Sequence, residues 1–176
     1  MANHEQRAFL TWDVLAGRAT ARGRCTYGEV ADLIGLHHRP LRYVLELIQE
    51  YCLAEKLPPL TIIVVNQQTG EPGAGFIGWS RDNLEEGVRK VYSHPWSQEP
   101  NPFSYARDGA TIETIADRLC AVPDDAANIY ASVRIRGTAQ IIFRRALLHA
   151  YKAQCAMCGI TNEHVLEAAR IVTWSH

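Results

Sequence analysis

Apolar residues in the first half of the chain recur three and four positions apart, which is the spacing of helices that bury one face. The first such stretch, residues 5–16, is predicted to end at Gly17 and to place inward Phe9, Trp12 and Leu15. A later stretch, residues 81–92, follows Ser80 as N-cap and is predicted to place inward Leu84, Val88 and Val91. We expect both stretches to be amphipathic helices.

Between these two stretches, residues 25–76 predict two helices followed by a β-hairpin. Thr26 is a good N-cap for a short helix that stops at Gly35, and Pro40 suits the first turn of a longer helix. The buried face of the longer helix is predicted to hold Leu41, Val44, Leu45 and Ile48. The β-branched run 60–65 then indicates a buried strand, and the glycine-rich stretch after it supplies a hairpin turn. Two helices and a hairpin make a winged helix, a fold used chiefly to hold DNA.

The second half of the chain predicts a smaller module of mixed structure. Residues 95–109 contain three prolines and little periodicity, so they are the expected linker between a domain of residues 1–94 and a module of residues 110–176. The module is expected to hold a helix, a half-buried strand and a second helix, over residues 111–121, 128–137 and 138–154. The predicted fold class is therefore α+β.

Composition and charge exclude a membrane protein and leave the partner open. The chain has 176 residues, of which 47% are hydrophobic and 21% charged, as in a soluble globular protein. No apolar run approaches the roughly 20 residues that span a bilayer, and no secretory signal pattern opens the chain, so we expect a cytoplasmic protein. The net charge of −1 does not indicate nucleic acid. One group of basic residues has no acidic residue between its members and could contact nucleic acid, although solvated faces also carry such runs. The group consists of Arg134, Arg136, Arg144, Arg145 and Lys152.

Two blocks of the first half resemble the DNA-binding domain of O6-alkylguanine-DNA alkyltransferases and alkyltransferase-like proteins. These are T-Y-G-E-V-A-D-L-I-G and V-V-N-Q-Q-T-G-E-P-G-A-G-F, and the resemblance covers roughly residues 5–94. In that family, the tyrosine crowds a phosphate while a nucleotide is rotated out of the stack, and an arginine fills the vacancy. The resemblance gives these roles to Tyr27 and Arg42, with Arg39 as a rival because the loop is one residue longer. The alternative is a half-buried core tyrosine and a solvated arginine.

The chain differs from this family at the position of the cysteine that accepts the alkyl group. The family's enzymes have a reactive cysteine in P-C-H-R just before the wing, and the matching residues here are L-T-I-I, at 60–63. Cys52 lies on the preceding predicted helix. We therefore expect no alkyl transfer, and we expect double-stranded DNA as the partner.

The C-terminal run F-R-R-A-L-L-H-A-Y-K-A-Q-C-A-M-C-G, with V-L-E-A-A-R-I-V-T-W-S-H, resembles the opening of an HNH nuclease domain of restriction-like proteins, a ββα-metal fold. In that family a histidine activates the attacking water, and Mg²⁺ or another divalent metal stabilises charge on the phosphate. Arg170 stands at the histidine position, where its high pKa prevents it from acting as a base. His176 is the remaining catalytic candidate. The resemblance thus implies an incomplete motif, either in a fragment of a longer nuclease or in a decayed remnant, and we expect no cleavage.

Cys155 and Cys158 have the C-x-x-C spacing of metal ligands, in a stretch that predicts a knuckle-like turn. A structural zinc site needs four ligands, and the usual second pair is absent. His164 and His176 are the candidates for the remaining positions. The alternative is a pair of ordinary thiols.

These patterns give a first hypothesis of a DNA-binding protein of the HNH restriction-endonuclease type, whose winged helix recognises DNA, including a modified or flipped base. The second hypothesis is a catalytically silent DNA-binding or regulatory protein, whose C-terminal module is structural or forms a homodimer. The third is a winged helix that binds other proteins. Replacement of Arg39 and Arg42 by alanine is expected to weaken DNA binding under the first two hypotheses only.

Overall fold

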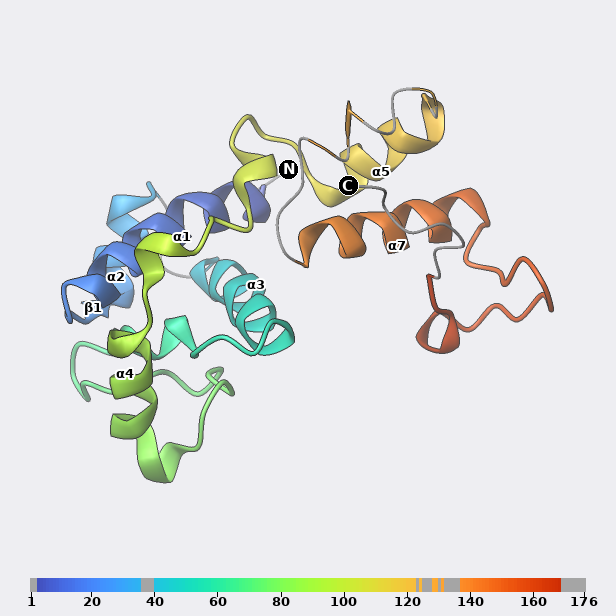
Figure 1. Ribbon diagram of the computed structural model, residues 1–176. Helices are drawn as coiled ribbons and strands as arrows, with labels where there is room; N and C mark the ends of the chain where they lie inside the picture. Colours follow the sequence, from blue (N-terminus) through green and yellow to red (C-terminus); the bar gives the residue numbers. More distant parts are fainter. Residues whose placement is uncertain are drawn as a thin grey trace. The chain divides into compact units, whose positions relative to one another are not determined.

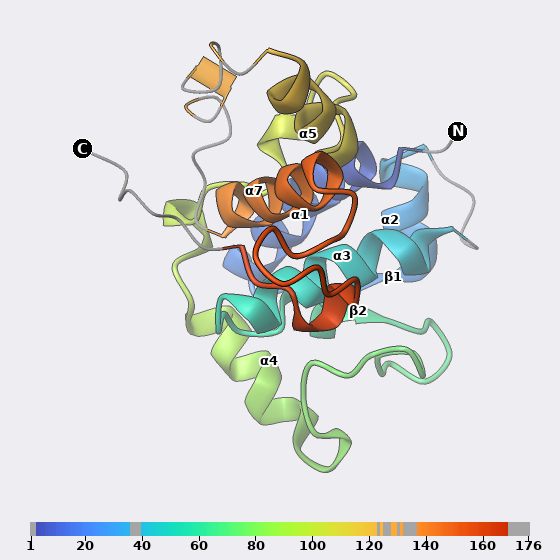
Figure 2. The ribbon, with the colours of Figure 1, turned by 90° about the vertical axis from the view of Figure 1, so that its right-hand side faces the viewer.

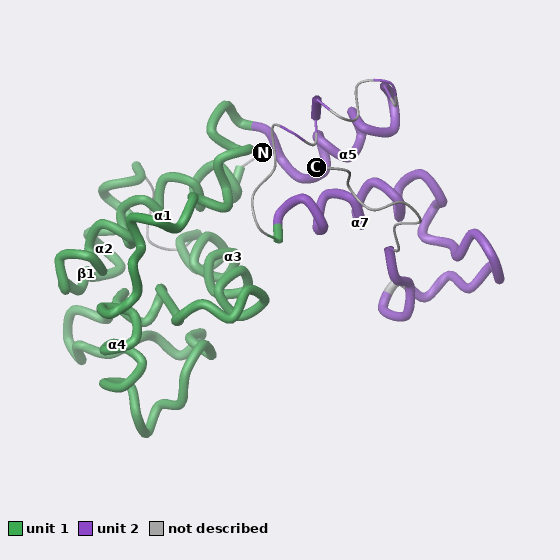
Figure 3. Tube along the Cα trace, viewed as in Figure 1, with its two compact units in different colours: residues 1–109, 135–137 green, residues 110–134, 138–176 purple. Residues whose placement is uncertain are grey.

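The computed structural model describes residues 3–35, 40–122, 124, 128–129, 131 and 137–168 of the chain. The chain divides into two compact units, residues 1–109 with 135–137 and residues 110–134 with 138–176 (Figure 3). The described elements are mostly helices, with a small two-stranded parallel sheet, an arrangement compatible with the α+β class. No helix among the described residues is long and apolar enough to cross a membrane.

The elements of the first unit are coloured from blue to yellow-green in chain order (Figure 1). In order they are α1 (His4–Thr20), β1 (Cys25–Thr26), α2 (Tyr27–Leu33), α3 (Leu41–Ala54), η1 (Leu60–Ile63), β2 (Val64–Val65), η2 (Arg81–Asn83), α4 (Leu84–Ser93), η3 (Trp96–Gln98) and η4 (Ser104–Ala106), where η denotes a 3-10 helix. Strand β1 pairs in parallel with β2, and Cys25 lies opposite Val64.

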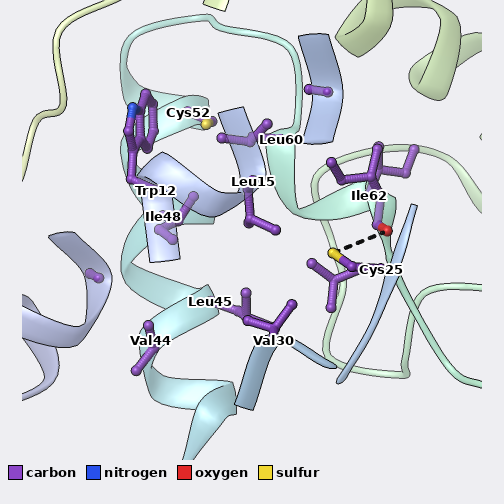
Figure 4. Packing of buried hydrophobic residues seen from close by; sticks show 14 of the residues in the cluster. Trp12, Leu15, Cys25, Val30, Val44, Leu45, Ile48, Cys52, Leu60 and Ile62 are labelled. Atoms are coloured by element: carbon purple, nitrogen blue, oxygen red, sulfur yellow. Dashed lines mark hydrogen bonds between the residues drawn. The ribbon is translucent and has the colours of Figure 1, made fainter. Parts of the chain in front are cut away.

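The core of the first unit lies where α1 packs against α3 and both contact η1 (Figures 1 and 2). The predicted inward face of α3 is confirmed, because Leu41, Val44, Leu45 and Ile48 are all buried. From α1, Trp12 and Leu15 enter the same cluster, and Leu60 and Ile62 of η1 close it (Figure 4). Val88 and Val91 of α4 are buried as predicted.

Helix α1 runs three residues past its predicted end. Gly17 has a helical conformation, and Ala19 beyond it is fully buried, so the last turn extends the buried face of the helix. The helix stops where Arg22 adopts a left-handed conformation with φ of 54°. The main-chain N–H of Gly23 then donates to the carbonyl of Arg18 at 2.8 Å.

The predicted strand 60–65 is wrong over most of its length. Residues 60–63 form the 3-10 helix η1, in which the N–H of Ile62 donates to the carbonyl of Pro59 at 2.9 Å. Helices α1, α3 and α4 contact this segment, and no strand among the described residues pairs with residues 60–63. Local hydrogen bonds satisfy its backbone instead. The predicted hairpin is also wrong, because residues 66–80 contain no strand and β2 pairs with β1.

The predicted linker, residues 95–109, packs on α1. The rings of Trp96 and Phe103 lie edge-to-face on Trp12, with centroid distances of 5.8 and 6.3 Å. The side-chain amide of Asn101 donates to a main-chain carbonyl of α1 at 2.8 Å. Because these aromatic rings are buried, the segment forms part of the first unit's core.

In the second unit, α5 (Ile112–Ala121) packs against α7 (Thr138–Ala150), and η6 (Glu163–Val165) follows (Figure 1). Both helices were predicted, and Thr111 caps α5 by accepting from the N–H of Thr114 at 3.2 Å. The buried face of α5 holds Ile115, Ala116 and Leu119. Two exposed pairs cross between the helices: Arg145 with Glu113 at 3.5 Å, and His149 with Asp117 at 3.6 Å.

The predicted strand 128–137 is wrong at the positions that the structure describes. Asn128, Ile129 and Ala131 are helical, and Gly137 lies in a turn. A lone strand would leave its backbone groups unpaired, and the described part of the second unit holds no strand to pair with it, whereas a helix pairs those groups locally. The other residues of this stretch, including Arg134 and Arg136, lie outside the described residues.

Candidate nucleic-acid interface

The first turn of α2 fixes the position of Tyr27 through a capping box. The hydroxyl of Thr26 accepts from the N–H of Glu29 at 3.2 Å, and the carboxylate of Glu29 accepts from the N–H of Thr26 at 2.6 Å. These bonds from the main chain and side chain of Thr26 lower the pKa of the Glu29 carboxyl. Tyr27 is therefore the first residue of a well-capped helix.

Tyr27 ties α2 to the loop that follows β2. Its hydroxyl oxygen accepts from the N–H of Gly73 at 2.8 Å, and Arg81 donates to the carbonyl of Gly73 at 2.6 Å. A Cβ atom on Gly73 would lie 2.9 Å from the Tyr27 hydroxyl oxygen, so this close approach requires glycine. The hydroxyl proton of Tyr27 has no acceptor among the described residues and remains able to donate to a ligand.

Arg42 lies in the first turn of α3 and stacks on its neighbour. Its guanidinium carbon is 4.3 Å from the centroid of the Tyr43 ring, and its Nη2 donates to the Tyr43 hydroxyl at 2.5 Å. The His4 ring packs at 5.3 Å from the same tyrosine. Arg42 is exposed and has no acidic partner in the described part of the chain.

Tyr27 and Arg42 line one cavity of about 650 Å³ in the first unit. We name it the α3 cavity. It is bounded by α2, α3, η1 and the loop after β2, through Tyr27, Arg42, Tyr43, Leu45, Glu46, Gln49, Glu50, Thr61, Gly73, Gly75, Phe76 and Ile77. The loop is held in place by Gln49, whose side-chain oxygen accepts from the N–H of Ile77 at 3.0 Å.

Thr61 is one of the residues of this cavity that were not predicted from the sequence. It is 5% exposed, and its hydroxyl has no hydrogen-bond partner among the described residues. The signal was present in the sequence, because aligning L-T-I-I with P-C-H-R places Thr61 at the position of the reactive cysteine. A neutral hydroxyl without an adjacent base is a weak nucleophile, so this position favours binding over covalent chemistry.

Neither buried cysteine of the first unit lines the α3 cavity. Burial raises the pKa of the Cys25 thiol to about 11 and that of the Cys52 thiol also to about 11. The sulfur of Cys25 lies 4.0 Å from the carbonyl oxygen of Ile63 (Figure 4). Both groups are therefore protonated packing residues at neutral pH.

The other predicted DNA-binding and catalytic residues do not line the α3 cavity. Arg144 donates to the carbonyl of Leu166, and Arg145 faces Glu113, so both have partners within the second unit. The remaining candidates fall outside the described residues: Arg39, Arg134, Arg136, Arg170 and His176.

Cys155 and Cys158 lie in the expected turn. The N–H of Cys155 donates to the carbonyl of Ile160 at 2.8 Å, and the N–H of Gly159 donates to the carbonyl of Cys155 at 3.0 Å. Main-chain N–H groups of Cys158 and Met157 lower the pKa of the Cys155 thiol. No cluster of three or more His, Cys, Asp or Glu side chains able to hold a metal ion occurs among the described residues. Because a structural zinc site needs four ligands, zinc binding at Cys155 and Cys158 stays a prediction.

Comparison with known proteins gives no identity: no family model, no curated protein and no solved structure matches this chain. The function is therefore inferred from the α3 cavity and from the chemistry of the residues that line it.

Proposed function

We propose that the chain binds double-stranded DNA through the surface around Tyr27 and Arg42, as a unit that resembles the DNA-binding domain of alkyltransferase-like proteins but lacks its predicted hairpin in residues 66–80. The observation that carries this proposal is that the two residues come from the first turns of different helices and line one cavity. A tyrosine hydroxyl and an arginine at one edge of a cavity provide the phosphate contacts that position a duplex. The cavity beside them then receives a base rotated out of the stack.

The charges around the α3 cavity indicate which side of it the DNA backbone contacts. Arg42 is the cation among its lining residues, whereas Glu46 and Glu50 are exposed carboxylates on the next turns of α3. Carboxylates repel phosphate, so the DNA backbone follows the edge formed by Tyr27 and Arg42. Glu46 and Glu50 are then next to an uncharged base and not next to a phosphate.

We further propose that the second unit is the beginning of an HNH nuclease-like module in a restriction-type protein, with an incomplete catalytic motif in this chain. Arg170 replaces the histidine that would activate water. The alternative is a catalytically silent DNA-binding protein with a structural or dimerising second unit. The engagement of Arg144 and Arg145 with partners inside that unit favours this alternative.

The test is fluorescence anisotropy of a labelled duplex at several salt concentrations, with the intact chain and two variants. Arg42→Ala removes the proposed phosphate contact, and Arg89→Ala removes an exposed arginine of α4 that lies outside the cavity. We expect Arg42→Ala to weaken binding and to reduce the slope of log K against log salt by about 1, while Arg89→Ala leaves both unchanged.

Two outcomes would contradict the proposal. The first is an absence of binding at low salt, and the second is an equal effect of both variants. Adding Mg²⁺ to the same mixtures tests the nuclease part separately, because cut products would show that the chain completes a catalytic site that the HNH resemblance does not supply.

A further inference from the structure

Gly73 is held by the side chains of two other elements. Its N–H donates to the hydroxyl oxygen of Tyr27 at 2.8 Å, and its carbonyl oxygen accepts from Nη2 of Arg81 at 2.6 Å. The same carbonyl accepts from the N–H of Phe76 at 3.1 Å, which closes a short turn. The peptide groups on both sides of Gly73 are therefore hydrogen-bonded, and these bonds fix its backbone conformation.

The position of Gly73 makes these bonds necessary. Glycine has the widest choice of backbone conformations, and residues 66–80 form a loop that contains no strand. A Cβ atom on Gly73 would lie 2.9 Å from the Tyr27 hydroxyl oxygen, so a larger residue would displace the tyrosine. Without the bond from Arg81, the Gly73 N–H would be free to turn away from Tyr27.

Arg81 reaches this loop from outside the α3 cavity. It is the first residue of η2, which Ser80 caps by accepting from the N–H of Asp82 at 3.4 Å. Tyr27 and Gly73 line the α3 cavity, whereas Arg81 lines a separate cavity of about 280 Å³ beside α4. Arg81 therefore contacts the loop without being part of the surface that carries Tyr27 and Arg42.

The bond from Gly73 determines how the Tyr27 hydroxyl can contact DNA. Because its oxygen accepts from Gly73, the hydroxyl proton is left to donate, and a phosphate oxygen is an acceptor. Hydrogen bonds in a chain also polarise one another, so a hydroxyl that accepts one bond becomes a better donor. Loss of the bond from Gly73 would leave the hydroxyl free to rotate and would weaken its contact with a phosphate.

We infer that Arg81 is a positioning residue for DNA binding. By holding the carbonyl of Gly73, it keeps the Gly73 N–H on Tyr27 and so directs the tyrosine hydroxyl towards a DNA phosphate. This inference rests on the proposed binding of DNA and adds a residue that does not line the α3 cavity. The alternative is that Arg81, which is exposed, contacts a phosphate itself.

The first measurement is amide hydrogen exchange of Gly73, followed by NMR on the intact chain without DNA. We expect exchange at least about 5-fold faster in Arg81→Met and in Tyr27→Phe, because each change removes a bond that holds Gly73. Arg81→Lys keeps a donor for the carbonyl and should restore the slower rate. Arg89→Met, the same change at an exposed arginine of α4, should have no effect. An unchanged rate in Arg81→Met would overturn the inference.

A double-mutant cycle of duplex affinities then separates positioning from direct contact. We expect Tyr27→Phe to weaken binding about 10-fold and Arg81→Met about 3- to 10-fold. In the Tyr27→Phe chain, Arg81→Met should cause no further loss, because both changes remove the same contact. The slope of log K against log salt should be the same in Arg81→Met as in the intact chain, since no cation leaves a phosphate.

The outcomes that would overturn the inference differ from one another. A salt slope reduced by about 1 in Arg81→Met, with additive losses in the cycle, would show that Arg81 binds a phosphate directly. Additive losses with an unchanged slope would show that Arg81 acts on the loop independently of Tyr27. Both results leave DNA binding in place. If no duplex binds at low salt, the proposed function fails, and the inference fails with it.

Discussion

At the scale of single residues, the cysteines of this chain fall into two chemical classes. Burial raises the pKa of Cys25 and Cys52 to about 11, whereas main-chain N–H groups lower the pKa of the partly exposed Cys155. The thiolate is the reactive form, and its abundance at a given pH follows the pKa.

We therefore predict that iodoacetamide at neutral pH modifies Cys155 first and leaves Cys25 and Cys52 unmodified in the folded chain. Peptide mass spectrometry over time gives the order of labelling. For the two buried thiols, protonation favours the folded state below their unfolded pKa of 9.0, and this contribution is lost as the pH rises towards about 11. Labelling of Cys25 or Cys52 as fast as that of Cys155 at neutral pH would contradict this assignment.

The candidate residues of the α3 cavity were predicted from the sequence only where a motif names them. The T-Y-G block and the arginines after it identified Tyr27 and Arg42, which line the same cavity. The acidic pair of α3 and Thr61 were not identified, because the cavity also depends on the loop after β2. That loop is placed by the hydrogen bond from Ile77 to Gln49, a contact between distant positions that no local pattern encodes.

At the scale of secondary structure elements, two helical glycines have opposite environments. A Cβ atom on Gly87 of α4 would lie 2.6 Å from Cδ1 of Ile62 and 2.9 Å from the Trp79 ring. On Gly17 of α1, the same atom would have no neighbour within 4 Å. Gly87 thus allows α4 to approach η1, whereas Gly17 is exposed and makes no such approach.

We predict that Gly87→Ala lowers the free energy of unfolding by about 1–3 kcal/mol, because overpacking displaces the buried Ile62. Gly17→Ala should raise it by roughly 0.5–1 kcal/mol, because alanine is the better helix former. Urea denaturation followed by circular dichroism measures both changes. A neutral or stabilising Gly87→Ala would show that α4 does not pack against η1 as closely as described.

The helices were predictable from patterns within a few residues. The structure of residues 60–65 was not, because it depends on contacts with distant parts of the chain. The capping box at Thr26 and the apolar spacing of α3 depend on neighbours within one or two turns, so these helices were predictable. Whether residues 60–65 form a strand depends on a partner strand from elsewhere in the chain. Helices α1, α3 and α4 contact this segment instead, and its first four residues form η1.

At the scale of the whole molecule, the first compact unit extends beyond the predicted domain of residues 1–94 and includes the predicted linker, residues 95–109. The aromatic rings of Trp96 and Phe103 extend the first unit to Gly109. The proposed DNA-binding surface lies entirely within that unit, because all the lining residues of the α3 cavity come from residues 27–77. We therefore propose that the first unit binds DNA by itself.

The most direct test of DNA binding at the α3 cavity is an NMR footprint of a short duplex on the isotope-labelled intact chain. We predict that chemical shifts change most at Tyr27, Arg42, Tyr43 and the loop 73–77, with little change along the exposed face of α4. Shift changes confined to α4 or to the second unit, or no changes at low salt, would contradict the assignment of DNA binding to this cavity.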